Sequence, residues 1–268
     1  GTTWDNVTFT YPGKHTPALT EVSFKAEPGQ SIALVGRAGS GKSTISSLLT
    51  RFYSPQQGQV KLDDKSLETI DLKSLRAQFA VVSQNVTLFN DSIANNIAYG
   101  AKETVSREQI EHAVKMAHVE EFLDNLPDGL DTVIGENGLM LSGGQRQRVG
   151  IARALALEPK LIVCDEAVSA LDVSIQAQVI NLLEDLQKEL GLTYLFIAHD
   201  LAVVRHLCHR IVVMYLGRVV EVADRETLYD NPQHPYTQAL LGAIPISNPD
   251  PEVQQHFNPS LSGEVPSP

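Results

Sequence analysis

The pattern of apolar and polar positions divides the chain into strands of two kinds. Apolar and polar residues alternate over residues 4–10 and 18–26, which a Tyr11-Pro12-Gly13 turn and a short loop separate. This period of two predicts a pair of antiparallel strands. Later runs are apolar almost throughout, as expected of buried strands. They cover residues 31–35, 79–83, 161–164 and 193–198, and residues 58–62 are expected to form a further strand.

Helical patterns fill most of the remaining chain. Helices are expected over residues 45–52, 71–78, 146–157 and from about 174 to 190. The long stretch of residues 92–130 also has a helical pattern, in which Asp91 or Ser92 caps one helix. Ser106 begins another, and Gln109 completes a capping box with it. Because this stretch separates strands of the sheet, it predicts a helical subdomain, and the alternation of strands and helices predicts an α/β fold.

Length, charge and cysteine content exclude several classes of protein. At 268 residues, the chain is long enough to bury a sizeable core. Its net charge of −11 argues against a nucleic-acid-binding surface. Cys164 and Cys208 form no disulfide framework and suit a reducing cytosol. No apolar run approaches the roughly 18 residues of a membrane span, and we expect neither direct membrane insertion nor a signal peptide.

A glycine-rich stretch, GRAGSGKST at residues 36–44, carries the first chemical signal. It places Gly36, Gly41, Lys42 and Ser43 as the phosphate-binding pattern G-x-x-x-x-G-K-[ST] requires, between an expected strand and an expected helix. Glycines let successive N–H groups turn inward, and the helix places its positive end under the phosphates. Lys42 would reach the β- and γ-phosphates, and Ser43 would offer its hydroxyl to Mg²⁺. The alternative interpretation is a glycine-rich turn before a helix.

Polar residues follow three of the buried strands. Asp165 and Glu166 follow the run at residues 161–164, and since alternate strand residues point opposite ways, the two carboxylates have different roles. Asp165 would hold Mg²⁺ through a water molecule, and Glu166 would orient or deprotonate the attacking water. His199 would donate a hydrogen bond to the γ-phosphate. Gln84 lies at the strand end where ligands collect in open α/β sheets.

Two further candidates leave alternatives open. Tyr11 is either packed on a neighbour at the end of a strand or stacked on an adenine base. The stretch Leu141-Ser142-Gly143-Gly144-Gln145 precedes an expected helix, so it is either a glycine-rich N-cap or a second anion site. It lacks a lysine and would not hold a nucleotide alone. His206, Cys208 and His209 cluster without a fourth ligand, which favours core and surface roles over a metal site.

The joint order and spacing of these motifs resembles the nucleotide-binding domain of ATP-binding-cassette (ABC) transporters. The motifs are GRAGSGKST, Gln84, LSGGQ, the LIVCDE strand, SALD and His199. The resemblance covers residue 4 to about residue 243. It implies a P-loop NTPase (RecA-like) core with an N-terminal antiparallel β subdomain and an inserted α-helical subdomain at about residues 85–157. Residues 1–246 would form the domain, and residues 247–268 a Pro-rich tail.

The resemblance also implies a set of site residues for ATP and Mg²⁺. The implied catalytic residues are Glu166, His199, Gln84 and Lys42, and the implied metal ligands are Ser43, Gln84 and Asp165. The implied nucleotide contacts are Tyr11, Gly36, Arg37, Ala38, Gly39, Ser40, Gly41, Lys42, Ser43, Thr44, Ser142, Gly143, Gly144, Gln145 and Asp172.

The same resemblance implies partners and a location. Two copies would form a head-to-tail dimer in which LSGGQ of one subunit completes the ATP site of the other. The ATPase would drive transport when it is joined to transmembrane subunits or domains, at the cytoplasmic face of the inner membrane. The alternative is a nucleotide-binding module with weak or no ATPase activity and no transport role. The transport pathway, and with it the substrate, would lie in other polypeptide.

Two branches of the family are represented in one sequence. Residues 1 to about 145 resemble the lipid-flippase (lipid A) exporters, with segments such as VSQNVTLFNDSIANNIAYG. Residues from about 146 to 250 resemble the ATPases of oligopeptide or dipeptide importers, with segments such as NPQHPYTQALLGAIP. Asp200 follows His199 as in importers, where exporters usually have an arginine. We interpret the sequence as an engineered chimera, with an unusual natural sequence as the alternative.

Overall fold

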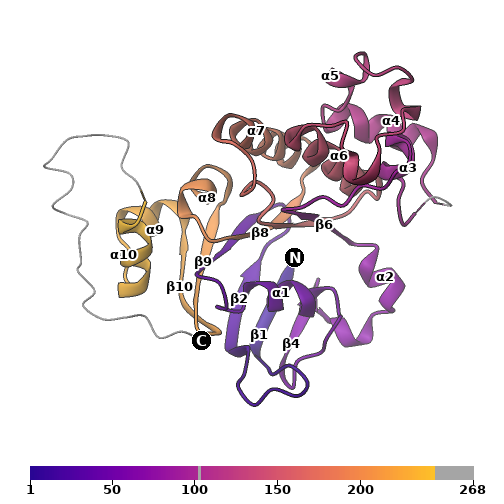
Figure 1. The fold of residues 1–268 in the computed structure, drawn as a ribbon. Coiled ribbons are helices and arrows are strands. Elements are labelled where there is room, and N and C mark those ends of the chain that lie inside the picture. The colour runs from indigo at the N-terminus through magenta and orange to yellow at the C-terminus, as the bar shows by residue number, and fades with distance from the viewer. Residues whose placement is uncertain (102–103, 245–268) are drawn as a thin grey trace, which may run out of the picture. The chain divides into compact units, whose positions relative to one another are not determined.

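The structure is a computed structural model that describes residues 1–101 and 104–244. The chain divides into two compact units: Gly1–Leu72 together with Leu195–Pro268, and Lys73–Tyr194. Each unit combines strands and helices, which confirms the α/β class (Figure 1). The expected tail at residues 247–268 lies outside the described residues.

The N-terminal strands form an antiparallel sheet, as their alternating pattern predicts. The strand order is β2-β1-β4-β5. The strands are β1 (Thr2–Phe9), β2 (Leu19–Ala26), β4 (Gln57–Leu62) and β5 (Lys65–Ser66). In the β1–β2 register Trp4 lies opposite Phe24, and their rings stack with centroids 5.4 Å apart. This aromatic pair fixes the buried face of the sheet.

The rest of the first unit is built around the strand that precedes the glycine-rich stretch. Neighbouring strands follow one another in the order β10 (Arg218–Asp224), β9 (Arg210–Tyr215), β3 (Ser31–Val35) and β8 (Thr193–Ala198). β9 is parallel to β3 and antiparallel to β10. All five residues of β3 are buried, as expected of a central parallel strand. The helical elements are α1 (Lys42–Leu49), η1 (Leu67–Thr69), α8 (Leu201–Leu207), α9 (Arg225–Asp230) and α10 (Pro235–Gly242).

The second unit surrounds two parallel strands, β6 (Phe79–Ser83) and β7 (Leu161–Asp165). Helices α3 and α4 pack on α6, which also contacts α7 (Figure 1). The helical elements are α3 (Ile93–Ile97), α4 (Arg107–Met116), α5 (Glu120–Leu123), η2 (Gly129–Asp131), η3 (Glu136–Gly138), α6 (Gly143–Ala156) and α7 (Val173–Leu190). The short α2 (Leu72–Arg76) precedes β6.

Two expected helices differ from those observed. The helix after the glycine-rich stretch begins at Lys42 rather than at residue 45, because Gly41 already serves as its N-cap with φ 98°. The helix expected at residues 146–157 likewise begins earlier, at Gly143, because Ser142 is its N-cap. In its described residues, the stretch from residue 92 to 130 contains the helices α3, α4 and α5 and the 3₁₀ turn η2, in keeping with its helical pattern. Its predicted caps are confirmed: Ser92 accepts from the N–H of Asn95, and Ser106 and Gln109 form the capping box.

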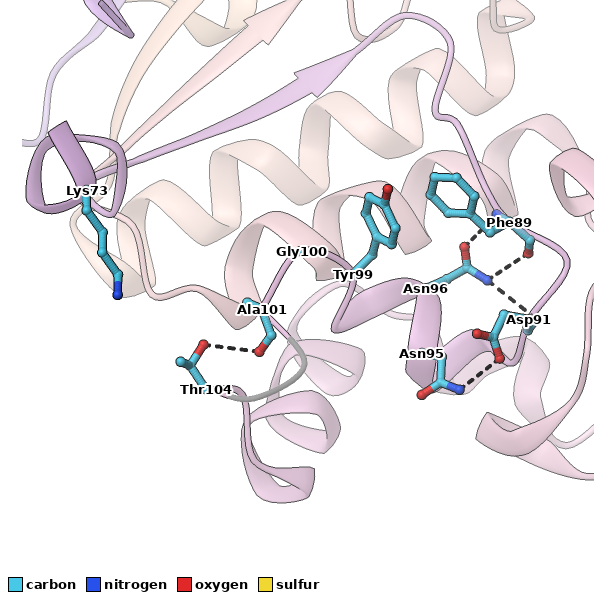
Figure 2. A pocket seen from close by; sticks show the side chains of 9 residues that line it. All are labelled: Lys73, Phe89, Asp91, Asn95, Asn96, Tyr99, Gly100, Ala101 and Thr104. Carbon is cyan, nitrogen blue, oxygen red and sulfur yellow. Dashed lines mark hydrogen bonds between the residues drawn. The ribbon is translucent and has the colours of Figure 1, made fainter.

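A buried asparagine organises the start of the helical part. Asn96 is 1% exposed, and its Oδ1 accepts from the N–H of Phe89 at 2.8 Å. Its Nδ2 donates to the carbonyls of Phe89 and Ser92, both at 3.0 Å. The neighbouring Asn95 is exposed, and its Nδ2 donates to the Asp91 carboxylate at 2.8 Å. Both asparagines line a hollow of about 780 Å³. Figure 2 shows the side chains around it.

We expect Asn96→Ala to lower the free energy of unfolding by about 2–3 kcal/mol, because it removes the hydrogen bonds of the buried Asn96 side chain and takes away the acceptor of the Phe89 N–H. Asn95→Ala, one position away on the same helix, should cost less than about 1 kcal/mol. Urea unfolding of both variants measures the difference. Equal losses would show that the buried hydrogen bonds of Asn96 do not hold this segment.

Candidate functional site

The glycine-rich stretch forms a loop between β3 and α1, and backbone packing explains its glycines. A Cβ on Gly36 would collide with the carbonyl oxygen of Met214 on β9. A Cβ on Gly41 would lie 2.7 Å from a methyl of Leu19 and 2.8 Å from the carbonyl oxygen of Ala18. Gly41 also has φ 98°, in the region that favours glycine. Side chains are therefore excluded from both ends of the loop.

Lys42 lies folded against the loop that precedes it. Its side chain is 6% exposed, and its Nζ donates to the carbonyl of Gly36 at 2.6 Å and to that of Arg37 at 2.8 Å. Its Nζ also lies 3.3 Å from the Ser40 hydroxyl. Ser43, the next residue, is exposed in the first turn of α1. The loop thus holds one cation at its inner side, next to an accessible hydroxyl.

Tyr11 reaches the same loop from the N-terminal sheet. Its hydroxyl lies 3.0 Å from the hydroxyl of Thr44, and its ring meets Phe9 and Tyr53 edge-on at 4.9 and 5.2 Å. The prediction that Tyr11 packs on a neighbour near a strand end is confirmed. The structure brings the ring to the side of the phosphate loop, and stacking on adenine stays a prediction.

In the second unit, Gln84, Asp165 and Glu166 collect at one edge. The parallel register pairs Ser83 of β6 with Asp165 of β7. Gln84 directly follows Ser83, and Glu166 directly follows Asp165, so both come at the same end of the paired strands. Glu166 has φ 52°, a conformation that few non-glycine residues adopt. Its carbonyl accepts from both the N–H and the hydroxyl of Ser169, at 3.0 and 2.9 Å. The chain therefore turns sharply at Glu166, directly after β7.

The LSGGQ stretch begins α6, and its N-cap interpretation is confirmed. The Ser142 hydroxyl accepts from the N–H of Gln145 at 3.2 Å, and the Gln145 side chain accepts from the N–H of Ser142 at 2.9 Å. This second capping box has the same spacing as Ser106 and Gln109, a signal that our sequence analysis missed. A Cβ on Gly144 would lie 2.6 Å from Ile175 of α7, so this glycine permits close packing of the two helices.

Asp172 caps one helix, and His199 lies just before the N-cap of another. The Asp172 carboxylate accepts from the N–H of Ile175 at 3.0 Å and caps α7. His199 is exposed directly after β8, in the first unit. The next residue, Asp200, accepts from the N–H of Ala202 at 2.7 Å and caps α8. Asp200 therefore has a local structural role as an N-cap.

The histidine and cysteine cluster has core and surface roles: Cys208 is buried, whereas His206 and His209 are exposed. His209 Nδ1 lies 3.0 Å from the N–H of Ser31 and 2.7 Å from its hydroxyl, which ties β9 to β3. Both cysteines are buried, and burial raises the pKa of the Cys164 thiol far above its ordinary value. In the described part of the chain, no three His, Cys, Asp or Glu side chains gather so as to hold a metal ion.

The candidate residues thus form two groups, one in each unit. Tyr11, the phosphate loop with Lys42, and His199 belong to the first unit, and the other candidates belong to the second. The hollow beside Asn96 is lined by Lys73, Phe89 and Tyr99 among others and contains none of the candidates (Figure 2). Within residues 1–101 and 104–244, no helix has the length and apolar character needed to cross a membrane.

Two family models match the chain. One, described as "ABC transporter", matches residues 19–169, which include the phosphate loop, LSGGQ and both carboxylates. The other, described as "Oligopeptide/dipeptide transporter, C-terminal region", matches residues 220–268.

Individual relatives include transport proteins of greater length. The chain is 53% identical over 223 residues to an ATP-dependent lipid A-core flippase of Pseudoalteromonas atlantica, and 50% identical over 226 residues to that of Escherichia coli. These alignments cover 83% and 84% of this chain but 38% of each flippase. A bacterial Atm1-family ABC exporter with ATP bound has a similar structure, with a TM-score of 0.78 and 38% identity over 87% of this chain and 40% of that one. This likeness confirms the expected P-loop NTPase fold.

Proposed function

Because the chain belongs to the ABC transporter family, we propose that it binds ATP and hydrolyses it with the help of Mg²⁺. The observation that carries this proposal is the buried Lys42 ammonium, which two loop carbonyls hold at 2.6 and 2.8 Å. An ammonium inside a glycine loop, at the N-terminus of a helix, attracts the phosphates of a nucleotide. Tyr11, beside that loop, would carry the adenine on its ring.

The oxygen donors of the two units suit Mg²⁺, a hard cation that prefers such ligands. Ser43 presents an exposed hydroxyl in the first turn of α1, Asp165 ends β7, and Gln84 directly follows the neighbouring β6. We assign Ser43, Gln84 and Asp165 as its ligands. When bound, the ion would neutralise charge that develops on the phosphate oxygens.

For hydrolysis we assign Glu166 as the group that orients or deprotonates the attacking water. The left-handed turn at Glu166, fixed by Ser169, supports this assignment, since such strained positions cluster at active sites. Gln84 would help to position the water, and His199 would donate a hydrogen bond to the γ-phosphate. Lys42 would stabilise the charge on the departing phosphate.

We further propose that the working form is a head-to-tail dimer joined to transmembrane subunits or domains, at the cytoplasmic face of the inner membrane. The chain matches only about two fifths of each flippase, so the membrane part would belong to other polypeptide or to a longer chain. Residues 1–246 would form the nucleotide-binding domain, and residues 85–157 its helical subdomain. In the dimer, Ser142, Gly143, Gly144, Gln145 and Asp172 would face ATP held by the partner's phosphate loop.

We also propose that the chain joins two branches of the family, either as an engineered chimera or, as the alternative, in an unusual natural sequence. The match of residues 220–268 to the oligopeptide and dipeptide transporters supports an importer-like C-terminal part. The flippase alignments, at 223 and 226 residues, extend past residue 145, so likeness to flippases does not stop at the proposed junction. Higher flippase identity before residue 145 than after it would support the proposal, and equal identity would refute it.

Replacing the proposed base tests the chemistry. We expect Glu166→Gln to bind ATP but to hydrolyse it at least about 10²-fold more slowly, because the water loses its general base. Glu184→Gln makes the same chemical change on α7, where Glu184 pairs only with surface Lys188 at 2.9 Å, and it should keep full activity. Phosphate release with Mg²⁺ measures turnover.

Two other variants separate the possible outcomes of that assay. Lys42→Ala should weaken ATP binding itself, because it removes the buried ammonium at the inner side of the loop. If Glu166→Gln keeps its turnover, Glu166 is not the base. If the unaltered chain binds ATP without turnover at any protein concentration, the alternative of a nucleotide-binding module without ATPase activity is correct.

The two capping boxes give a matched test of the dimer. In the Glu166→Gln background, ATP but not ADP should convert monomer to dimer in sedimentation velocity. Adding Ser142→Ala should weaken that dimer, since Ser142 would contact the partner's ATP. Adding Ser106→Ala should leave it unchanged, although each change removes an N-cap worth about 1 kcal/mol. Equal behaviour of the two serine variants would contradict a role of LSGGQ in the dimer.

If two branches of the family are joined near residue 145, side chains from the two parts must pack in one core. Mismatched packing between parts that were not selected together typically costs about 1–3 kcal/mol. We nevertheless expect a single cooperative transition in thermal unfolding followed by circular dichroism and tryptophan fluorescence, with Trp4 reporting on the first unit. Two separated transitions would show that the units unfold independently.

A further inference from the structure

The first peptide group of the phosphate loop is held from both sides. The carbonyl of Gly36 accepts from Lys42 Nζ at 2.6 Å, and the N–H of Arg37, in the same peptide group, donates to the Tyr236 hydroxyl at 3.0 Å. A peptide group is planar, with its C=O and N–H pointing in opposite directions. Rotation of this group would therefore break both hydrogen bonds together.

Tyr236 comes from α10, 199 positions further along the chain than Arg37. It is 9% exposed, and its ring packs against Tyr215 at the end of β9 with centroids 4.6 Å apart. The residue before Tyr215, Met214, is the one whose carbonyl crowds Gly36. The end of β9 and the start of α10 thus both support the first residues of the loop.

The start of α10 is itself fixed to the sheet. The Glu221 carboxylate of β10 accepts from the N–H groups of Gln233 and His234, both at 2.9 Å. His234 Nδ1 accepts from the N–H of Tyr236 at 3.1 Å and caps the helix, and Pro235 opens it with a fixed φ. Little freedom is left to the Tyr236 ring, so its hydroxyl is preorganised to accept from the loop.

We propose that Tyr236 is a positioning residue for nucleotide binding, through which the C-terminal region sets the affinity of the phosphate loop for ATP. Its hydroxyl fixes the orientation of the Gly36–Arg37 peptide group and hence the carbonyl on which Lys42 rests. Tyr236 lies in the region that matches the oligopeptide and dipeptide transporters, whereas the loop lies in the part that matches ABC transporters in general. The inference rests on the proposed binding of ATP.

A residue that only orients the loop has a distinct kinetic signature. The orientation of the Gly36–Arg37 peptide group affects the bound substrate and the transition state alike. Loss of the hydroxyl should therefore raise KM and the ATP dissociation constant and leave kcat nearly unchanged. Loss of one hydrogen bond of about 1 kcal/mol from the part-buried N–H of Arg37 corresponds to a change of about fivefold in each constant.

Tyr236→Phe removes only the hydroxyl, and Tyr229→Phe is its matched control. Tyr229 lies on α9 in the same C-terminal region, and its hydroxyl donates to the Leu201 carbonyl, far in sequence from the loop. Both variants keep the ring, so both should fold. The measurements are the affinity for fluorescent methylanthraniloyl-ATP, KM and kcat for ATP, and the hydrogen-exchange rate of the Arg37 amide by NMR.

We expect Tyr236→Phe to raise the dissociation constant and KM about fivefold, keep kcat within about twofold, and speed exchange of the Arg37 amide, whereas Tyr229→Phe changes none of these. Unchanged affinity in Tyr236→Phe would overturn the proposal. So would an equal loss in Tyr229→Phe, because the effect would then be general destabilisation. If the unaltered chain binds ATP without turnover, the proposed hydrolysis fails, and the affinities still decide this inference.

Discussion

The first unit depends on one tight turn, in which the backbone of residues 36–41 passes from a buried strand into a helix. This turn directs carbonyl groups inward, where an unpaired carbonyl would be costly. Lys42 provides the partner, because its ammonium donates to the carbonyls of Gly36 and Arg37. The same turn needs glycine where the Met214 carbonyl and Leu19 approach. Its geometry also begins α1 at Lys42 and so exposes Ser43.

The helix starts of the second unit show that a structural role and a binding role can coexist in one residue. The capping box between Ser142 and Gln145 uses the Ser142 hydroxyl as an acceptor, and this leaves its O–H free to act as a donor. It pairs the N–H groups of Ser142 and Gln145, whereas those of Gly143 and Gly144 have no acceptor within the helix. The N-cap and anion-site interpretations are therefore compatible, and Gly144 keeps this surface close to α7.

Support for the phosphate loop comes from residues far apart in the sequence. Tyr11 contacts Thr44 from the N-terminal sheet, and Tyr236 contacts Arg37 from α10. The two tyrosines thus contact opposite ends of the loop segment. Tyr11 follows β1, whereas Tyr236 lies on α10, whose start is held by Glu221 of β10. Differences in a C-terminal region could in this way change nucleotide affinity without any change in the loop itself.

Local signals determined much of this fold from the sequence alone. Period-two alternation predicted the antiparallel pair, continuous apolar runs gave the bounds of β6 and β8, and the caps at Ser92 and Ser106 were found because capping acts over three residues. The glycine pattern, with Lys42 and Ser43, identified the phosphate loop. Only the tertiary structure decided that Ser83 pairs with Asp165 and that Tyr236 accepts from Arg37. Periodicity records which face of an element is buried, but not which distant element covers it, since that depends on strand order and on packing across the whole unit.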